Sequence, residues 1–473
     1  MKFFTIMLLV LLTFSGKTQT NQLLVTTKTG GDYNNGVILL ADTDGTNFHK
    51  VYSFIGPEGR WPIGKSAVDA NGIVYGVTEF GGLGDSCTVY SFNVQTNDCQ
   101  LLHDFYATID SGWWDVFGPT LLPDGMLYGT TTQGGRYGKG SIYRLNTSTH
   151  HFEDLYDLDT LTLGAGAGAL YYATDGKLYG MTSSYGLNGS GTIFSLDPVT
   201  QQLDILYNMI DSMGHGAAGT FMQGSDGKIY GTTSFSAGFS FSYGTIFSFD
   251  LTSHVYKRLH KFDLWHGCFP NGALVQAPND KLYGLCRQGG QSYGVLFSYD
   301  LQTDSFKVLH NFVSATGERP LSTLTLATNG KLYGTASEGG THNAGVAFSY
   351  DINDSLYSVI FNFDSVNGAR PAGTIIETNP HLNNTTSVLP AKQDVSFRIM
   401  PNPASSHAVI SSSQPVINIS VTDMKGAQVI TAIKQISPNT YQLDGLDLLP
   451  NGIYFVKADM GKYEQVRRLT IHK

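Results

Sequence analysis

The sequence has little charge, few cysteines and, beyond its N-terminus, no long apolar run. Charged residues make up 14% of the chain, and the formal net charge is -9. Lys and Arg do not cluster, which excludes a nucleic-acid partner, because the phosphate backbone requires a basic face. No later segment has the roughly 18 consecutive apolar residues of a membrane-spanning helix. We therefore expect a mature chain that is soluble or is anchored by some other means.

Glycine and aromatic residues are abundant instead. The chain contains 55 Gly, 26 Tyr and 27 Phe, and 41% of its 473 residues are hydrophobic. A chain of this length and hydrophobic content can bury a large core and suggests two or more domains. Aromatic residues favour strands and glycines favour turns, so an all-β fold is predicted.

Residues 1–20 have the build of a secretory signal peptide. Lys2 is followed by an apolar run from Phe3 to Phe14 and then by small and polar residues. The run is too short to act as a membrane-spanning anchor. We expect export, with cleavage between about Gly16 and Thr20.

One short pattern recurs through most of the chain. An LYG-type element places a tyrosine at Tyr75, Tyr128, Tyr179, Tyr230, Tyr283 and Tyr333, and a degenerate copy, LLVTT, has Leu24 in that position. Successive copies lie 50 to 53 residues apart. A fixed period near 50 residues predicts a propeller or a solenoid.

Each period contains four runs typical of strands, as in 272–277, 281–286, 294–300 and 306–312. Four antiparallel strands form one propeller blade. The first copy begins at its second strand, and the last copy ends with an unpartnered first strand, AGTIIET. We predict a seven-bladed β-propeller over residues 21–378, closed by pairing of 372–378 with 22–27 so that no sheet edge stays exposed. In this interpretation the Gly after each tyrosine lets a neighbouring blade approach closely.

The pattern LYGTTxxGG followed by GTIFSF resembles the GloVer-type (Gloeobacter/Verrucomicrobia) tandem repeat over nearly all of residues 22–378. The GG after the second strand is also similar to kelch repeats. The resemblance implies a kelch-like β-propeller and no defined activity, because a fold alone does not determine a function.

After residue 378 the period stops. Residues 379–394 are polar, contain two prolines and are interpreted as a linker. Residues 395–473 alternate in short strands, enough for a small immunoglobulin-like β-sandwich.

This C-terminal segment resembles the type A sorting domain of the type IX secretion system of Bacteroidetes. The residues that carry the resemblance include Pro401, Asn402, Pro403, Gly426, Gly452 and Tyr454. The resemblance implies that the signal peptide leads to the periplasm and that residues 395–473 engage the type IX machinery to cross the outer membrane. It implies a secreted protein, extracellular or attached to the cell surface.

Neither the glycine loops nor the repeat histidines form a recognisable site. No glycine loop is followed by the GK[ST] and helix start of a phosphate cradle. His103, His260 and His310 occupy one position of the repeat, where the other copies have Tyr or Phe. They are interpreted as packing rings, and we expect no metal and no cofactor.

The four cysteines allow three pairings. Cys268 and Cys286 fall at the same end of one predicted blade, so a Cys268–Cys286 disulfide is predicted for an oxidising compartment. Cys87 and Cys99 are expected to stay unpaired.

The loops that join one blade to the next differ among the copies and are expected to surround the mouth of the channel. They hold every tryptophan, and stacking faces suit sugar rings or peptide aromatics. The candidate ligand-binding residues are Trp61, Trp113, Trp114, His215, Trp265, Arg319 and Arg370. The alternative is that each Trp packs against its own blade beside a structural Gly and Pro, as in GRWPIG.

Two functions of different class fit these features. The preferred one is a non-catalytic, monomeric binding or adhesion protein of the cell surface that takes a glycan or a protein. The alternative is an extracellular polysaccharide-acting enzyme, a glycoside hydrolase or lyase, which would need a close pair of carboxylates. The same loops carry Glu58, Asp110, Asp115, Asp211, Asp263, Glu318 and Asp364, one or two in each loop, as expected for solvated turn residues.

Overall fold

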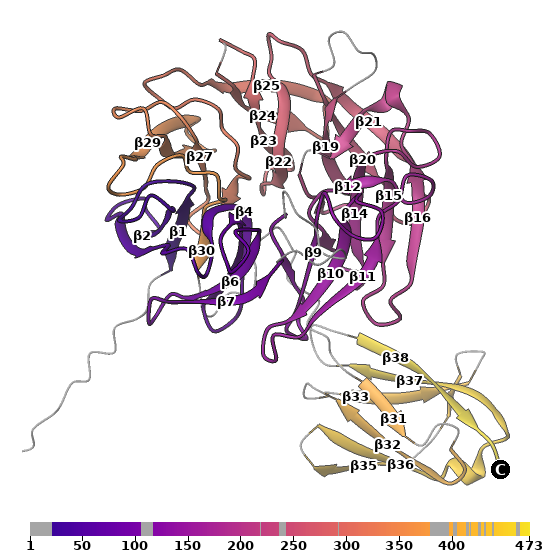
Figure 1. Cartoon of the computed structure of the whole chain (residues 1–473). Coiled ribbons are helices and arrows are strands. Elements are labelled where there is room, and N and C mark those ends of the chain that lie inside the picture. Colours follow the sequence, from indigo (N-terminus) through magenta and orange to yellow (C-terminus); the bar gives the residue numbers. More distant parts are fainter. Residues whose placement is uncertain are drawn as a thin grey trace, which may run out of the picture. The chain divides into compact units, whose positions relative to one another are not determined.

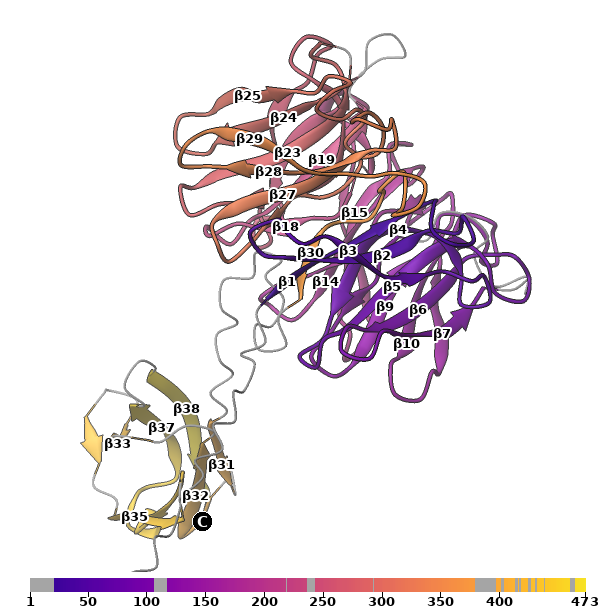
Figure 2. The ribbon, with the colours of Figure 1, turned by 90° about the vertical axis from the view of Figure 1, so that its left-hand side faces the viewer.

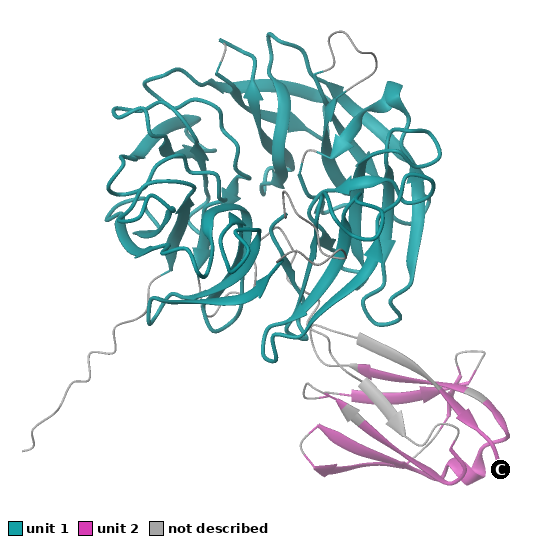
Figure 3. Ribbon diagram, viewed as in Figure 1, with its two compact units in different colours: residues 1–388 teal, residues 389–473 magenta. Residues whose placement is uncertain are grey.

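The computed structural model describes residues 21–105, 117–217, 219–235, 243–291, 293–378, 397–400, 404–412, 416, 418–423, 427–429, 432–437, 439–459 and 464–473. The chain divides into two compact units, residues 1–388 and 389–473 (Figure 3). The described residues form strands and two short 3-10 helices, η1 (Asp211–Met213) and η2 (Leu446–Leu448). The all-β class is therefore confirmed. The predicted signal peptide, residues 1–20, and the predicted linker, residues 379–394, lie outside the described residues.

Unit 1 contains seven antiparallel sheets in its described part (Figures 1 and 2). The first sheet joins the two ends of the unit: β1 (Gln22–Thr27), β2 (Val37–Asp42), β3 (His49–Ser53) and β30 (Ile376–Thr378). The next two consist of β4 (Arg60–Val68), β5 (Ile73–Phe80), β6 (Thr88–Asn93) and β7 (Asp98–Asp104), then β8 (Thr120–Leu121), β9 (Met126–Thr130), β10 (Ser141–Asn146) and β11 (Phe152–Asp157).

The remaining four sheets repeat the same order of strands. Two have a divided first strand: β12 (Ala165–Ala167), β13 (Tyr171–Tyr172), β14 (Leu178–Ser184), β15 (Thr192–Leu196) and β16 (Leu203–Asn208), then β17 (His215–Ala217), β18 (Met222–Gln223), β19 (Ile229–Phe235), β20 (Thr245–Phe249) and β21 (Tyr256–Lys261). The last two are β22 (Cys268–Gln276), β23 (Lys281–Gln288), β24 (Val295–Asp300) and β25 (Ser305–Asn311), then β26 (Thr325–Leu326), β27 (Lys331–Ala336), β28 (Val346–Asp351) and β29 (Leu356–Asn362).

The strand from the C-terminal end of unit 1 completes the first sheet. β30 pairs antiparallel with β1, with Gln22 opposite Thr378 and Leu24 opposite Ile376, and Figure 1 shows indigo β1 beside orange β30. The strand is shorter than the predicted 372–378. Residues before Ile376 leave the ladder because the Thr374 N–H donates instead to the Gly64 carbonyl, at 3.1 Å.

Backbone contacts link the first-strand segments of successive sheets. A Cβ on Gly168 would lie 2.7 Å from the Gly219 carbonyl oxygen, and one on Gly219 would lie 2.5 Å from Gly272. Gly64 forms a parallel bridge with Gly373. We call the residues in this repeat position the collar: Gly64, Gly118, Gly168, Gly219, Gly272, Ser322 and Gly373. A side chain at these glycines would separate neighbouring sheets, because it would occupy the space of the next backbone.

The Gly of each LYG element serves a contact within its own sheet. Gly334 stands opposite Phe348 on the neighbouring strand, and a Cβ on Gly334 would lie 2.6 Å from the Phe348 ring. The expectation that this Gly admits a neighbouring blade is therefore wrong, because the ring of the cross-strand partner fills the space. The first sheet, which lacks this Gly, also lacks the ring: Val25 stands opposite Leu39.

The core of unit 1 lies between sheets. One cluster joins Tyr283 and Leu296 of one sheet to Leu332 and Phe348 of the next. The repeat histidines extend this packing, since His103 stacks on Phe152 at a ring-centroid distance of 3.8 Å. His260 on Phe306 and His310 on Tyr357 stack in the same way, at 4.0 and 3.7 Å. As the sequence predicts, these histidines act as packing rings.

In its described part, unit 2 consists of two four-stranded antiparallel sheets that share one core. The sheets are β31 (Phe397–Met400), β32 (His407–Ser412), β36 (Thr440–Asp444) and β35 (Ala432–Ser437), and β34 (Gln428–Val429), β33 (Asn418–Thr422), β37 (Gly452–Asp459) and β38 (Glu464–Ile471). Ile410 and Leu443 of one sheet pack in the same cluster as Val421, Val456 and Leu469 of the other. The sequence did not predict β32 or β35, because each is polar along much of its length.

We expect Gly334→Ala to destabilise unit 1 by about 1–3 kcal/mol, because the new methyl group overlaps the Phe348 ring. Urea unfolding measures the change. The double variant Gly334→Ala/Phe348→Leu imitates the Val25 and Leu39 pair of the first sheet, and its loss should be smaller than the sum of the two single losses. If the losses in free energy of unfolding were additive, the contact between residue 334 and the Phe348 ring would be contradicted.

We also expect the protein to lose stability as the pH falls from about 6.5 to 4. Burial lowers the pKa of His103, His260 and His310 to about 4, whereas an unfolded histidine titrates near 6.5. Between these two pKa values the unfolded chain binds more protons than the folded chain. The contribution of these histidines to the free energy of unfolding is therefore fully present above pH 6.5 and declines below it. The melting temperature should change less with pH in the triple variant His103→Tyr/His260→Tyr/His310→Tyr, because Tyr does not titrate in this range. Tyr is chosen because it occupies this position in three other sheets. An equally steep profile in the triple variant would contradict the assignment.

Candidate functional site

The described loops that enter the first strands share a position with positive φ. Its non-glycine residues are Trp61 (φ 60), Phe269 (φ 53), Arg319 (φ 53) and Arg370 (φ 53). A side chain in this region costs on the order of 1 kcal/mol. The backbone N–H at this position reaches the previous sheet, since Arg370 donates to the Ala344 carbonyl at 2.8 Å and Trp61 to the Asn35 carbonyl at 2.8 Å. The hydrogen bond to the previous sheet therefore fixes the backbone at this position, whereas the side chain differs between sheets.

We call this surface the loop face and define it by Trp61, His215, Trp265, Phe269, Arg319 and Arg370. Phe269 was not predicted as a site residue, although its place before Pro270, like that of Trp61 before Pro62, was a signal that could have found it. The predicted Trp113 and Trp114 lie outside the described residues.

Trp61 has features of both predicted alternatives, packing against its own blade and exposure for a ligand. Its ring packs edge-on against Phe80 of its own sheet, at a centroid distance of 5.2 Å. Lys28 Nζ and Arg60 Cζ lie 5.4 and 5.3 Å from the indole centroid, within cation–π range. The side chain stays partly exposed, so one face is packed while the residue still contributes to the surface.

A second aromatic group lies around Phe269. His215 stacks on Phe235 at 5.4 Å, Phe235 meets Phe269 edge-on at 6.1 Å, and Phe269 meets Tyr243 at 6.3 Å. Phe235 is 42% exposed. These rings come from two neighbouring sheets, so the structure brings the predicted His215 together with aromatic residues that sequence reasoning did not select.

Trp265 is the most exposed aromatic residue of the loop face, at 81%. Its backbone N–H donates to Asp263 at 2.8 Å, which fixes the turn but does not cover the indole. Arg319 and Arg370 are exposed as well. Arg319 pairs with Glu338 at 3.1 Å. The loop face thus presents aromatic rings and guanidinium groups on a backbone set by the repeat.

The described loop carboxylates are engaged within their own loops. Glu58 is 6% exposed and accepts hydrogen bonds from the Tyr52 hydroxyl and the Ile55 N–H, both at 2.7 Å, so the expectation that it is a solvated turn residue is wrong. Asp263 lies 2.9 Å from His266 Nδ1, and Asp364 accepts two backbone N–H groups of its own turn. Asp110 and Asp115 lie outside the described residues.

A cavity of about 330 Å³ lies on the far side of the collar from the loop face along each first strand. Along the first strands, its wall runs from Lys65, the residue directly after Gly64, to Thr328 and Glu377. All seven sheets of unit 1 contribute first-strand residues to its wall. Most of the wall is apolar, and no predicted ligand-binding residue lines it. Sequence reasoning missed this cavity because the first strands have the least regular pattern of the repeat.

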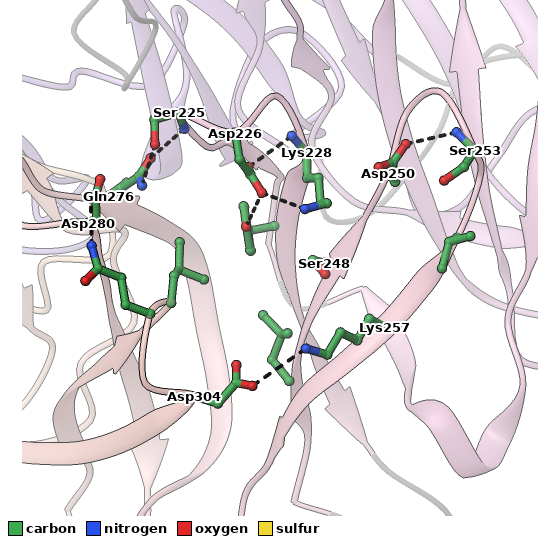
Figure 4. A pocket seen from close by; sticks show the side chains of 15 residues that line it. Ser225, Asp226, Lys228, Ser248, Asp250, Ser253, Lys257, Gln276, Asp280 and Asp304 are labelled. Atoms are coloured by element: carbon green, nitrogen blue, oxygen red, sulfur yellow. Dashed lines mark hydrogen bonds and ion pairs between the residues drawn. The ribbon is translucent and has the colours of Figure 1, made fainter.

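A second hollow of about 520 Å³ lies between the sheets of β19 and β23 (Figure 4). Both of its lysines pair with aspartates, and Asp250 accepts backbone N–H groups of its own turn. Lys228 Nζ lies 2.8 Å from Asp226, and Lys257 Nζ lies 3.8 Å from Asp304. The first pair lies within one turn and the second joins two neighbouring sheets, which indicates a structural role. Over the described ranges, His, Cys, Asp and Glu side chains do not gather in a group of three that could hold a metal ion.

All four cysteines are free thiols in the structure. Cys268 stands opposite Gln288, and Cys286 stands opposite Pro270, so the two are diagonal neighbours on paired strands. Diagonal Cα atoms are about 7–8 Å apart, whereas a disulfide needs about 4.4–6.8 Å. The Cys268–Cys286 disulfide stays a prediction that requires a local shift of one strand.

Thiol titration of the exported protein after unfolding without reductant tests this disulfide. Two reactive thiols per chain, with Cys268 and Cys286 joined in one peptide, would support it. Four reactive thiols would contradict it and match the geometry of the structure. In the folded protein we expect Cys286 to react slowly, because burial raises the pKa of its thiol well above the ordinary value.

In unit 2, the predicted motif residues that can be placed are Gly452 and Tyr454. Gly452 begins β37, and Tyr454 is buried and donates its hydroxyl to the Pro450 carbonyl at 2.9 Å. Pro401, Asn402, Pro403 and Gly426 lie outside the described residues. The described part of the chain contains no helix long and apolar enough to cross a membrane.

Solved structures similar to this chain are propeller-like folds. A candidate 6-phosphogluconolactonase from Bacteroides fragilis has a TM-score of 0.53 at 14% identity and covers 76% of this chain and 99% of its own. A hypothetical selenium-binding protein from Sulfolobus tokodaii has a TM-score of 0.51 at 12% identity and covers 76% of this chain and 91% of its own. At these identities the likeness shows the fold alone. No curated protein matches the chain.

Two family models match the chain and together cover most of it. The Gloeobacter/Verrucomicrobia repeat matches residues 13–172 and 166–392, and the secretion system C-terminal sorting domain matches residues 398–472. The chain therefore belongs to the family of proteins built from the Gloeobacter/Verrucomicrobia repeat, and its C-terminal type IX sorting domain makes it a secreted protein, extracellular or attached to the cell surface.

Proposed function

We propose that residues 21–378 form a seven-bladed propeller that binds an extracellular glycan through the loop face, without catalysis. The observation that carries the proposal is Trp265, whose indole is 81% exposed on a loop whose backbone is fixed by Asp263. Exposing a large ring to water is unfavourable unless a partner covers it. In an exported protein, the sugar rings of glycans are partners with matching stacking faces.

The arrangement of the loop face supports recognition of a saccharide chain. Trp61 and the group around Phe269 offer rings on separate sheets, so one chain could contact more than one sheet. Arg370 supplies a planar donor for the hydroxyl or carboxylate groups of sugars. The carboxylates described above hold their own turns, which favours binding over hydrolysis.

Affinity electrophoresis against a panel of soluble polysaccharides tests the proposal. We expect Trp265→Ser and Trp61→Gly each to weaken binding by about tenfold, the scale of an interface residue that dominates binding. Glycine is chosen at Trp61 because it removes the indole and accepts the φ of 60, so the backbone is expected to stay in place.

Val199→Ser is the matched control. Val199 is 89% exposed and donates its N–H to Asp197 at 2.8 Å, the same turn that Trp265 forms with Asp263. We expect this variant to bind like the wild-type protein. Equal binding by Trp265→Ser and the wild-type protein would contradict the loop face as the binding surface. Binding of a protein but of no glycan would contradict the proposed ligand class. Release of shorter sugars from a polysaccharide would contradict the non-catalytic function.

A further inference from the structure

The cavity behind the collar holds one lysine in an otherwise mostly apolar wall. Lys65 is the first lining residue after Gly64, and its neighbours around the wall include Ala67, Leu121 and Leu324. Among the described residues, no carboxylate lies within ion-pair distance of its ammonium group. Burial lowers the pKa of Lys65 to about 8, which is the direction expected for an ammonium group without a counter-charge.

Acidic groups on the elements around Lys65 are already engaged. Glu79 at the end of β5 pairs with Lys28 at 2.6 Å. Glu377, at the other end of the cavity, accepts hydrogen bonds from the Asn21 side-chain amide and the Thr328 N–H, both at 2.9 Å. Asp69, after β4, accepts the N–H groups of its own turn. The other titratable groups of the wall are the phenols of Tyr171 and Tyr172.

Hydroxyl groups occupy the same repeat position as Lys65 on other sheets. Thr374 Oγ1 accepts the Thr323 N–H at 3.4 Å, and Thr323 Oγ1 accepts the Ala273 N–H at 3.0 Å. Both threonines line the cavity, and within the described part of the chain neither hydroxyl proton has an acceptor. A threonine hydroxyl can accept and donate at once, so these protons are available to an anion.

We propose that this cavity binds a small amphipathic monocarboxylate, with its carboxylate at Lys65 and the threonine hydroxyls and its hydrocarbon chain along the apolar wall. A carboxylate supplies the missing counter-charge, and a charge-assisted hydrogen bond is stronger in an apolar cavity than in water. A volume of about 330 Å³ corresponds to about eleven water-sized groups. A straight-chain acid of about ten heavy atoms, such as octanoate, matches this volume.

Isothermal titration of the folded wild-type protein with octanoate tests the site. We expect one ligand per chain at pH 7 and weaker binding at pH 9.5, where Lys65 has lost its proton. Octan-1-ol, which has the same chain without the charge, should bind more weakly and without this pH dependence. No octanoate binding at millimolar concentration, or equal binding of the acid and the alcohol, would overturn the proposal.

Three variants separate the charge from the packing. Lys65→Met keeps the chain length and is expected to weaken octanoate binding about tenfold, whereas Lys65→Arg should retain most of it. Lys331→Met is the matched control, because Lys331 lies outside the cavity and pairs with Asp351 at 3.8 Å; it should bind normally. Unchanged affinity in Lys65→Met would overturn the proposal. If this variant does not fold, Lys65→Arg and the pH dependence of the wild type still decide.

The site does not depend on the proposed glycan-binding function. Trp265 and Trp61 are separated from the cavity by the collar, so Trp265→Ser should bind octanoate like the wild type. Loss of octanoate binding in both Trp265→Ser and Lys65→Met would indicate a general structural defect and contradict a local site.

Discussion

The close backbone contact between neighbouring sheets is the constraint on which the rest of unit 1 depends. Collar residues meet backbone to backbone, as Gly219 does with Gly272, and the parallel bridge between Gly64 and Gly373 joins the two ends of the series. Six of the seven collar residues are glycines, whose lack of a side chain allows this approach. The same contact divides or shortens several first strands, and it separates the loop face from the cavity along each strand.

Outside the collar, at the loop positions, the side chains are free to differ between sheets. At the position of Trp61, Phe269, Arg319 and Arg370, the backbone N–H contacts the previous sheet whatever the side chain is. The fold can therefore change its surface chemistry from one sheet to the next without altering its hydrogen bonds. This explains why residues of different chemistry occupy equivalent loop positions in a chain whose second strands follow one pattern.

Much of the fold could be predicted because the repeat supplies several aligned copies of one strand pattern. The offset between the first and last copies indicated that β30 would meet β1. The partner of the LYG glycine could not be found in this way. Its contact with Phe348 depends on which residues face each other across two strands, and the periodicity of one strand does not contain that register.

The candidate sites were less accessible to sequence reasoning. Exposed Trp265 was found from its residue type and loop position, whereas Glu58 was misjudged because its burial depends on the Tyr52 hydroxyl. Lys65 gave no signal, since a single lysine in a strand normally lies in solvent. Its significance comes from the six other segments that line the cavity with it, which are far apart in the sequence.

The pairing of β1 with β30 also bears on how the protein is made. Gln22 and Thr378 are 356 positions apart, and their ladder is among the most non-local contacts that the chain can form. Contacts of this kind form late, because most of the chain must be ordered before its ends can meet. During synthesis the first sheet stays one strand short until residue 378 is available. An exported chain built in this way keeps its earliest strands from completing their fold until nearly all of unit 1 has been made.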